Sequence, residues 1–246
     1  MKLNSVATLI IPNREAAEKP AVKEFILHAE AIFIAGGDQA RYINFWQGTP
    51  VQDAINTEIA DGKPIGGTSA GLAVLGEFVY GALGDKPDDP DLVSTDVLPN
   101  PYFPRVTLVR DFLKIAPLRD TITDSHFAKR DRMGRTLGFL ARLMQDGWSQ
   151  NPREVAIDEK SAVLVEVDGE ATVVGSGKGA YFLRPAEPPQ VCRDGVPLTF
   201  HNIGVYKAPA GAKFNLMTWT GEGGSSYSLS VDRGTIQSTQ QRNVVY

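Results

Sequence analysis

The sequence predicts an α/β protein built on a parallel β-sheet, and two observations carry this prediction. First, apolar strand-like runs alternate with helical patterns, with strands expected at 6–12, 31–37 and 64–69 and helices at 15–29, 39–59 and 71–82. Such alternation is typical of parallel strands joined by crossover helices. Second, the run at 31–37 is continuously apolar and stops at glycines, as expected of a strand buried on both faces.

The C-terminal third predicts a β-rich segment. Strand-like runs at 161–167 and 170–175 flank Asp168-Gly169, a dipeptide that favours a two-residue hairpin turn. Residues 84–104 are rich in Asp and Pro and predict a long loop. No repeat or second hydrophobic core is evident, so we expect one α/β domain over 1–246 in which 161–246 is a β-rich extension.

Composition excludes several classes of function. The 246 residues carry a net charge of −4, which argues against non-specific nucleic-acid binding. The lone Cys192 excludes an intrachain disulfide and a Cys-rich zinc site, and no glycine-rich nucleotide fingerprint is present, so no cofactor or metal is expected. No long apolar window and no secretory leader are visible, which predicts a cytoplasmic protein with no membrane partner; a start upstream of Met1 leaves secretion open.

The most informative motif is Gly67-Thr68-Ser69-Ala70-Gly71. A short apolar run leads into it and a helix-like segment follows, which is the pattern of a nucleophile elbow. At such a sharp strand-to-helix turn the serine hydroxyl is exposed, and the N–H of the next residue points to where an oxyanion would form. Ser69 is therefore the candidate nucleophile.

A serine nucleophile needs a base, and the chain has three histidines. His28 lies within an amphipathic helical pattern and His201 opens a strand-like run, so we interpret both as structural. His126 follows the run 121–125 at the expected carboxyl end of a strand, where sites assemble in open α/β sheets. His126 is the candidate base, and either Asp158 or Glu159, at the end of a further strand-like run, could orient it.

Arginines gather directly after His126, at positions 130, 132 and 135, where a helix with apolar positions Met133, Leu137, Leu140 and Met144 begins. Guanidinium groups bind carboxylates in a bidentate manner, so a substrate carboxylate would explain this cluster. The alternative is a solvated charged face in which Arg130 or Arg135 pairs with Asp131. The spacing from His126 favours the substrate interpretation.

Gly36 and Gly37, which end the apolar run, are followed by Asp38 and Gln39. In the simpler interpretation this is an ordinary βα turn in which Asp38 caps the next helix. Gln39 carries four hydrogen-bonding sites and could hold a substrate amide.

Together these motifs resemble the cyanophycinase branch of the S51 serine peptidases. The resemblance rests on residues 35–39, 67–71, 124–135 and 156–159 and extends from about Val6 to Val165. It implies a flavodoxin-like three-layer fold with a parallel sheet, akin to class I glutamine amidotransferases. It also implies hydrolysis of amide bonds that follow aspartyl residues, through an ester on the nucleophile.

Carried over position by position, the resemblance implies a role for each site residue. Ser69 would be the nucleophile, His126 the general base and Glu159 the orienting acid. Gly37 and Ala70 would supply oxyanion N–H groups. The positions that hold substrate would be Gln39, Asp124, Ser125, Arg130, Arg132 and Arg135.

One departure concerns the N-terminus. The resemblance implies a strand, a glycine-rich loop and a further βα unit before Val6, and we expect these elements to be missing here. Uncovered strand edges would favour pairing with another chain, so we expect a homodimer.

We expect a serine peptidase acting on β-aspartyl-arginine, cyanophycin-like substrates. The alternatives are an aspartyl dipeptidase of the same clan and a truncated, inactive binding protein. An α/β-hydrolase esterase is disfavoured because that fold places the acid before the histidine, whereas Glu159 follows His126.

Overall fold

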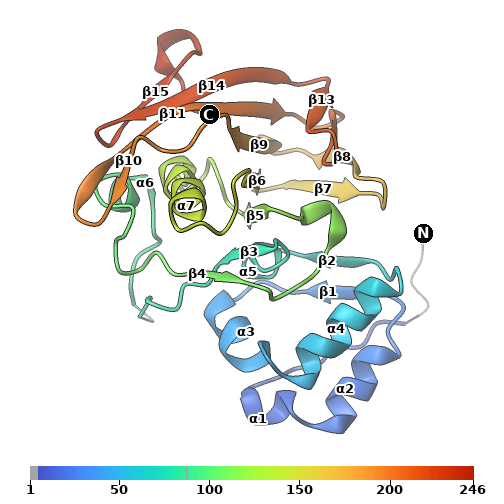
Figure 1. Cartoon of the computed structure of the whole chain (residues 1–246). Helices are drawn as coiled ribbons and strands as arrows, with labels where there is room; N and C mark the ends of the chain where they lie inside the picture. Colours follow the sequence, from blue (N-terminus) through green and yellow to red (C-terminus); the bar gives the residue numbers. More distant parts are fainter. Residues whose placement is uncertain (1–4, 87) are drawn as a thin grey trace.

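The computed structural model describes residues 5–86 and 88–246, which form a mixed α/β structure (Figure 1). The helices are α1 (Arg14–Ala17), α2 (Pro20–Leu27), α3 (Gln39–Trp46), α4 (Pro50–Ala60), α5 (Ala70–Ala73), α6 (Ser94–Val97) and α7 (Met133–Gln145), with 3₁₀ turns at Ala116–Leu118 and Gln241–Asn243. The strands before residue 160 are β1 (Ile32–Ile34), β2 (Ile65–Gly67), β3 (Phe78–Tyr80), β4 (Leu108–Arg110), β5 (Thr121–Asp124) and β6 (Arg153–Ile157). The later strands are β7 (Ser161–Val165), β8 (Glu170–Gly175), β9 (Ala180–Pro185), β10 (Val191–Arg193), β11 (Val196–Ala208), β12 (Lys213–Asn215), β13 (Thr220–Glu222), β14 (Ser225–Asp232) and β15 (Thr235–Ser238).

The helices expected in the N-terminal part are each interrupted by a proline. The helix expected over 15–29 is divided into α1 and α2, and α2 starts at Pro20. The helix expected over 39–59 is divided into α3 and α4, and α4 starts at Pro50. Proline lacks the N–H that an interior helical position needs but fits the first turn, so each proline begins a new helix.

Two other expectations for the N-terminal half are wrong. Residues 6–12 form no strand, and Val6 and Ile10 are exposed, because this segment pairs with no described strand. The helix expected over 71–82 ends at Ala73, and Phe78–Tyr80 instead form the fully buried β3, paired with β4 and β5. A short, continuously apolar run fits a buried strand as well as a buried helix, so periodicity alone could not separate the two.

The large sheet has nine strands in the order β15-β14-β11-β9-β6-β5-β3-β4, with β10 attached to β11. Only β3, β5 and β6 run parallel to one another, while β4 and the strands from β9 onward are antiparallel to their neighbours. β1 and β2 form a separate parallel pair. The expectation that the run at 31–37 is buried on both faces is wrong, because Phe33 of β1 is exposed. The expected parallel sheet is therefore one part of a mixed α/β architecture.

The segment expected as a β-rich extension contributes to two sheets. β7 and β8 form the expected antiparallel hairpin, but β7 ends at Val165, so residues 166–169 connect the strands instead of a two-residue turn; Gly169 has a φ of 86°. They continue into a four-stranded sheet in the order β13-β12-β8-β7. β9, β11, β14 and β15 instead complete the large sheet, so much of this segment shares its core with the residues before it.

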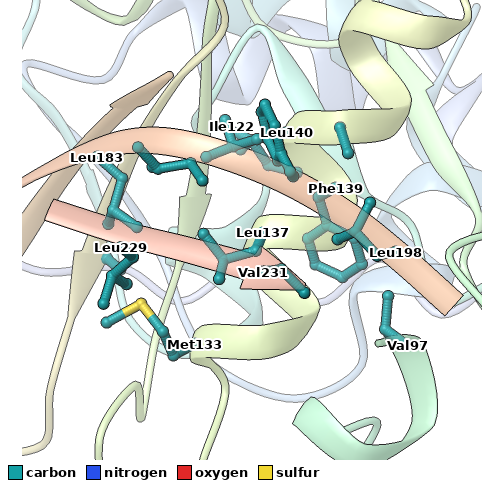
Figure 2. Packing of buried hydrophobic residues seen from close by; sticks show 14 of the residues in the cluster. Val97, Ile122, Met133, Leu137, Phe139, Leu140, Leu183, Leu198, Leu229 and Val231 are labelled. Carbon is teal, nitrogen blue, oxygen red and sulfur yellow. The ribbon is translucent and has the colours of Figure 1, made fainter. Parts of the chain in front are cut away.

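That shared core forms where α7 packs against the large sheet (Figure 1). Met133, Leu137 and Leu140 of α7 are fully buried, as their helical spacing predicts, and lie beside β11 and β14 (Figure 2). Two glycines of α7 permit the close approach of α6: a Cβ on Gly138 would collide with Val97, and one on Gly134 would collide with Ser94 and Leu98. This packing fixes the start of α7 beside the carboxyl end of β5.

Within the part of the chain that the structure describes, no helix is both long enough and apolar enough to cross a lipid bilayer.

Candidate active site

Ser69 stands at the sharp turn between β2 and α5. Its φ of 52° and ψ of −121° are strained for a residue with a side chain, and such strain persists where the surroundings enforce it. The two neighbouring glycines leave no room for a side chain. A Cβ on Gly67 would collide with the carbonyl of Gly71, and a Cβ on Gly71 would collide with the carbonyls of Ile34 and Ala35. The sequence thus folds locally into the turn that the motif predicts.

His126 lies two residues beyond the end of β5 and also has a left-handed backbone, with a φ of 50°. Its Nε2 lies 2.9 Å from the Ser69 Oγ, and its Nδ1 lies 3.0 Å from Oε1 of Glu159. When Nδ1 carries the proton and donates to the carboxylate, Nε2 is free to accept the serine proton. The three side chains therefore form one continuous hydrogen-bonded chain.

Glu159 and Asp158 point in different directions after β6. Asp158 is buried, and its Oδ1 accepts a hydrogen bond of 3.0 Å from the backbone N–H of Lys129. Glu159 is the carboxylate that reaches the histidine, and its hydrogen bond with His126 lowers the pKa of Glu159 from its ordinary value. Residue spacing alone had left these two neighbours as alternatives, and only Glu159 has the geometry of an orienting acid.

A cavity of about 410 Å³ opens beside Ser69. The residues expected at the oxyanion and substrate positions all line it, namely Gly37, Gln39, Ala70, Asp124, Ser125, Arg130, Arg132 and Arg135. Ala70 follows the serine as the first residue of α5, where a backbone N–H has no partner within the helix. The side chain of Asp38 caps α3 by accepting from the N–H of Ala40, which leaves Gln39 at the cavity wall.

Arg135 and Asp124 form a buried ion pair at the floor of this cavity. Arg135 donates through Nε to Oδ2 of Asp124 at 2.8 Å and through Nη2 to Oδ1, and its Nη1 donates to the carbonyl of Leu92. The arginine also stacks on the ring of Tyr80. Although burial opposes ionisation, Arg135 and then Arg132 hold the pKa of Asp124 below its ordinary value. The polar atoms of Arg135 are thus committed to protein partners.

Arg132 is less completely partnered. Its Nη1 donates to Asp124 and to the carbonyl of Ser125, while its Nε is buried without a hydrogen-bond partner among the described residues. Burial lowers the pKa of Arg132 from its ordinary value despite the attraction of Asp124. Arg132 therefore keeps one buried donor without a partner in the described part of the chain, on a side chain that lines the cavity.

Asp91 is a residue of the site that the sequence did not single out. Its carboxylate lies 2.8 Å from Nη1 of Arg130 and 3.5 Å from Nη2 of Arg132. The alternative interpretation, in which Arg130 or Arg135 pairs with Asp131, does not hold among the described residues: Asp131 accepts hydrogen bonds from Ser94 and Tyr246. The segment expected as one loop over 84–104 is interrupted by α6 at Ser94–Val97, and residues 85–92 before it, apart from Pro87, which lies outside the described residues, contribute to the cavity lining. Its Asp-rich composition was the available signal, but nothing in the spacing placed it beside the arginines.

The remaining histidines and the cysteine lie apart from this site. His28 ends α2 with its Nδ1 2.6 Å from the carbonyl of Glu24, and His201 lies within β11. Cys192 is buried in β10, and burial raises the pKa of its thiol to about 12. Over residues 5–86 and 88–246, no group of three or more His, Cys, Asp or Glu side chains could hold a metal ion.

Comparison with known sequences points to one group of hydrolases. A sequence model described as peptidase family S51 matches residues 5–106, which include the Ser69 motif but end before His126. Cyanophycinase from Nostoc sp. is 28% identical over 223 residues, covering 88% of this chain and 67% of that protein. Cyanophycinase from Synechococcus elongatus is 27% identical, covering 88% of this chain and 62% of that protein. The matched part therefore spans about two thirds of these relatives.

A similar solved structure is that of a peptidase from an acI-B1 Actinobacterium. Its sequence is 22% identical, the TM-score is 0.47, and the match covers 68% of this chain and 59% of that chain.

Proposed function

We propose that this chain, a peptidase hydrolase related to family S51, is a serine peptidase that hydrolyses β-aspartyl amide bonds, as in β-aspartyl-arginine, through an ester on Ser69. The observation that carries the proposal is the position of His126, whose two ring nitrogens lie 2.9 Å from Ser69 and 3.0 Å from Glu159. A serine, a histidine and a carboxylate in this geometry make an activated nucleophile.

The proposed reaction proceeds in two halves. The Ser69 Oγ attacks the amide carbonyl carbon while His126 Nε2 takes the hydroxyl proton, and the same proton then passes to the leaving nitrogen as the C–N bond breaks. Water next attacks the ester and gives a proton to His126, which returns it to the Ser69 oxygen. The products are an aspartyl carboxylate and a free amine, and Glu159 stabilises the imidazolium formed in each half.

The backbone N–H groups of Ala70 and Gly37 are proposed to bind the oxyanion. Both residues line the cavity that contains Ser69, and Ala70 follows it directly. Donors fixed by the backbone need no reorganisation when charge develops, so they stabilise the transition state more than the substrate. Gly37 also has a φ of 150°, a conformation that glycine adopts readily.

We propose that Arg132 and Arg130 bind the aspartyl carboxylate of the substrate. Both guanidinium groups line the cavity and pair there with the partly exposed Asp91, whereas Arg135 and Asp124 are occupied by each other. Arg135 and Asp124 then act by holding Arg132 in place. Gln39 would bind the substrate backbone from the opposite wall, and Ser125 would contribute its N–H or hydroxyl.

We also propose that the fold is of the flavodoxin-like type. The parallel strands β3, β5 and β6, together with a nucleophile between β2 and α5, agree with a flavodoxin-like sheet of the glutamine amidotransferase type. In such folds the site assembles at the carboxyl ends of parallel strands, as Ser69, His126 and Glu159 do here.

Three substrates assayed together test the proposal: β-Asp-Arg, α-Asp-Leu and a peptide without aspartate. We expect hydrolysis of β-Asp-Arg at a kcat/KM at least about tenfold above the others, because a lost charge-assisted hydrogen bond costs roughly 1.5–3 kcal/mol. Arg132→Lys should raise KM for β-Asp-Arg, since lysine lacks the guanidinium fork. Cleavage of α-Asp-Leu alone would indicate an aspartyl dipeptidase, and equal rates on all three would contradict specificity for aspartyl substrates.

A further inference from the structure

The start of α7 has an unusual residue at its N-cap. Arg132 occupies this position with no side-chain capping hydrogen bond. Ser, Thr, Asp and Asn are favoured there because their side-chain oxygens accept the free N–H groups of the first turn. Arginine has no acceptor, and its positive charge is unfavourable at the positive end of a helix. The helix therefore begins at a residue that cannot cap it.

Other parts of the chain supply the missing acceptors. The hydroxyl of Tyr246, the last residue of the sequence, accepts a 2.8 Å hydrogen bond from the N–H of Met133. The hydroxyl of Ser94 accepts a 2.8 Å hydrogen bond from the N–H of Gly134. A residue 113 positions away thus caps the first turn of α7 in place of Arg132.

Tyr246 also contacts the loop that leads into α7. Its hydroxyl donates to Oδ1 of Asp131 at 2.9 Å, and Asp131 has a left-handed φ of 48°. Its ring packs edge-on against Phe127, which directly follows His126. Burial raises the pKa of Tyr246, so its hydroxyl keeps the proton that it donates. One side chain therefore contacts the segment 126–133 at both ends.

We propose that Tyr246 is a positioning residue for substrate binding, which acts by capping α7 and thereby holding Arg132 in the cavity. This inference rests on the proposed function, in which Arg132 binds the aspartyl carboxylate. Without the hydroxyl, the Met133 N–H loses its acceptor and the Asp131 carboxylate loses one of its donors, so the turn around Arg132 is held less firmly. The backbone hydrogen bonds from Arg132 to Phe127 and from Ser94 to Asp131 remain. The hydrogen bonds of His126 with Ser69 and Glu159 do not involve this hydroxyl.

The variant Tyr246→Phe removes the hydroxyl and keeps the ring. We expect KM for β-Asp-Arg to rise about three- to tenfold, with kcat within about twofold of wild type, because a lost cap weakens the placement of Arg132 but leaves His126 in position. The matched control is Tyr102→Phe, whose hydroxyl donates at 2.6 Å to Asp146, the residue at the opposite end of α7. The control should leave KM unchanged.

A double-mutant cycle shows whether the effect passes through Arg132. In an Arg132→Lys background, Tyr246→Phe should raise KM no further, since the group that it positions has already been replaced. Equal increases in KM in both backgrounds would overturn the inference, as would an unchanged KM in a Tyr246→Phe variant with lowered thermal stability. A fall in kcat with slower fluorophosphonate labelling of Ser69 would also overturn it, because that result places the action at His126.

A measurement without substrate separates this inference from the proposed function. If the wild-type protein cleaves no aspartyl substrate, the proposed function fails, and amide hydrogen exchange still decides the role of Tyr246. Faster exchange confined to residues 130–136 in Tyr246→Phe, with unchanged labelling of Ser69, supports the positioning role. Exchange equal to that of wild type in this segment would overturn it.

Discussion

Ser69 and His126 both have left-handed backbones, although neither is glycine. Each such residue costs of order 1–3 kcal/mol unless its surroundings enforce the conformation. At Ser69 the enforcement comes from glycines packed against backbone carbonyls, and at His126 from the turn that follows β5. Both strained turns place their side chains toward one another, which is what proton transfer between them requires.

The choice between Glu159 and Asp158 gives a direct test at the level of residues. Glu159→Gln should lower kcat by at least about tenfold, because a neutral amide neither fixes the tautomer of His126 nor stabilises its charged form. Asp158→Asn should retain most of kcat, since Asp158 accepts from a backbone N–H and does not contact the histidine. Steady-state kinetics of the two folded variants decides this, and a larger loss of kcat in Asp158→Asn would reverse the assignment.

The raised pKa of Glu154 can be tested through the dependence of folding stability on pH. Its side chain is fully buried in β6, accepts a hydrogen bond from Thr136, and has its other oxygen unpartnered among the described residues. Burial, and secondarily the charge of Asp124, raises the pKa of Glu154 well above its ordinary value. A raised pKa in the folded state means that this group favours folding at low pH and loses that contribution as pH rises through the folded-state pKa.

Glu154→Gln keeps the shape of the side chain but removes the titration. We therefore expect the melting temperature of the wild-type protein to fall more steeply than that of Glu154→Gln as pH is raised above the ordinary pKa of glutamate. Thermal unfolding at a series of pH values measures the two slopes. Identical slopes would mean that Glu154 does not titrate in this way.

At the level of elements, the contact between α6 and α7 depends on the absence of a side chain at position 138. Gly138→Ala should destabilise the protein by roughly 1–3 kcal/mol, because the new methyl group would overlap Val97. This cost exceeds the gain of up to about 1 kcal/mol that alanine offers over glycine in a helix. Urea unfolding measures the net effect.

Val97→Ala supplies the matched control for that prediction. It removes the atoms that the new methyl group would meet, so the double variant should be less destabilised than the sum of the two single variants. Strict additivity would indicate that Gly138 is not constrained by this contact.

Elements with a local sequence signal are predicted correctly, and elements that depend on a distant neighbour are not. The apolar spacing of α7 predicted a helix, and Asp168-Gly169 predicted a hairpin between two strands. Both predictions rest on signals that are local in the sequence. The expectation of a strand at 6–12 failed because a strand needs a neighbour, and the expectation of a helix across β3 failed because a short apolar run fits either structure.

The candidate site likewise contains residues with a local sequence signal and residues that only tertiary contacts bring together. Local turn chemistry identified Ser69, and the expected carboxyl end of a strand identified His126. Tertiary packing alone brings Asp91 to Arg130 and brings Tyr246 to the residues on either side of Arg132, and no local pattern marks Asp91 or Tyr246.

At the level of the whole molecule, apolar surface remains uncovered around the β1–β2 pair. Phe33 of β1 is 70% exposed, and Val6 and Ile10 of the preceding segment are 78% and 79% exposed. Within the described residues, β1 pairs with β2 alone, so its other edge offers unpaired backbone groups. Edges and patches of this kind favour association with another chain.

We therefore expect the protein to self-associate at micromolar concentrations, in agreement with the proposed homodimer. Phe33→Ser should shift sedimentation profiles toward the monomer, because it removes the largest exposed apolar side chain of β1. Val167→Ser is the control, since Val167 is 91% exposed in the turn between β7 and β8. A wild-type protein that remains monomeric throughout this range would contradict the expectation.

In the proposed mechanism His126 activates Ser69 as a nucleophile, and labelling with a fluorophosphonate probes this activation because only an activated serine reacts. Intact-mass and peptide analysis should find one label per chain on Ser69 in the wild-type protein and none in Ser69→Ala. Labelling should be at least about a thousandfold slower in His126→Ala, since members of a triad act as a unit. A wild-type protein that stays unlabelled, or a His126→Ala variant labelled at the wild-type rate, would contradict this mechanism.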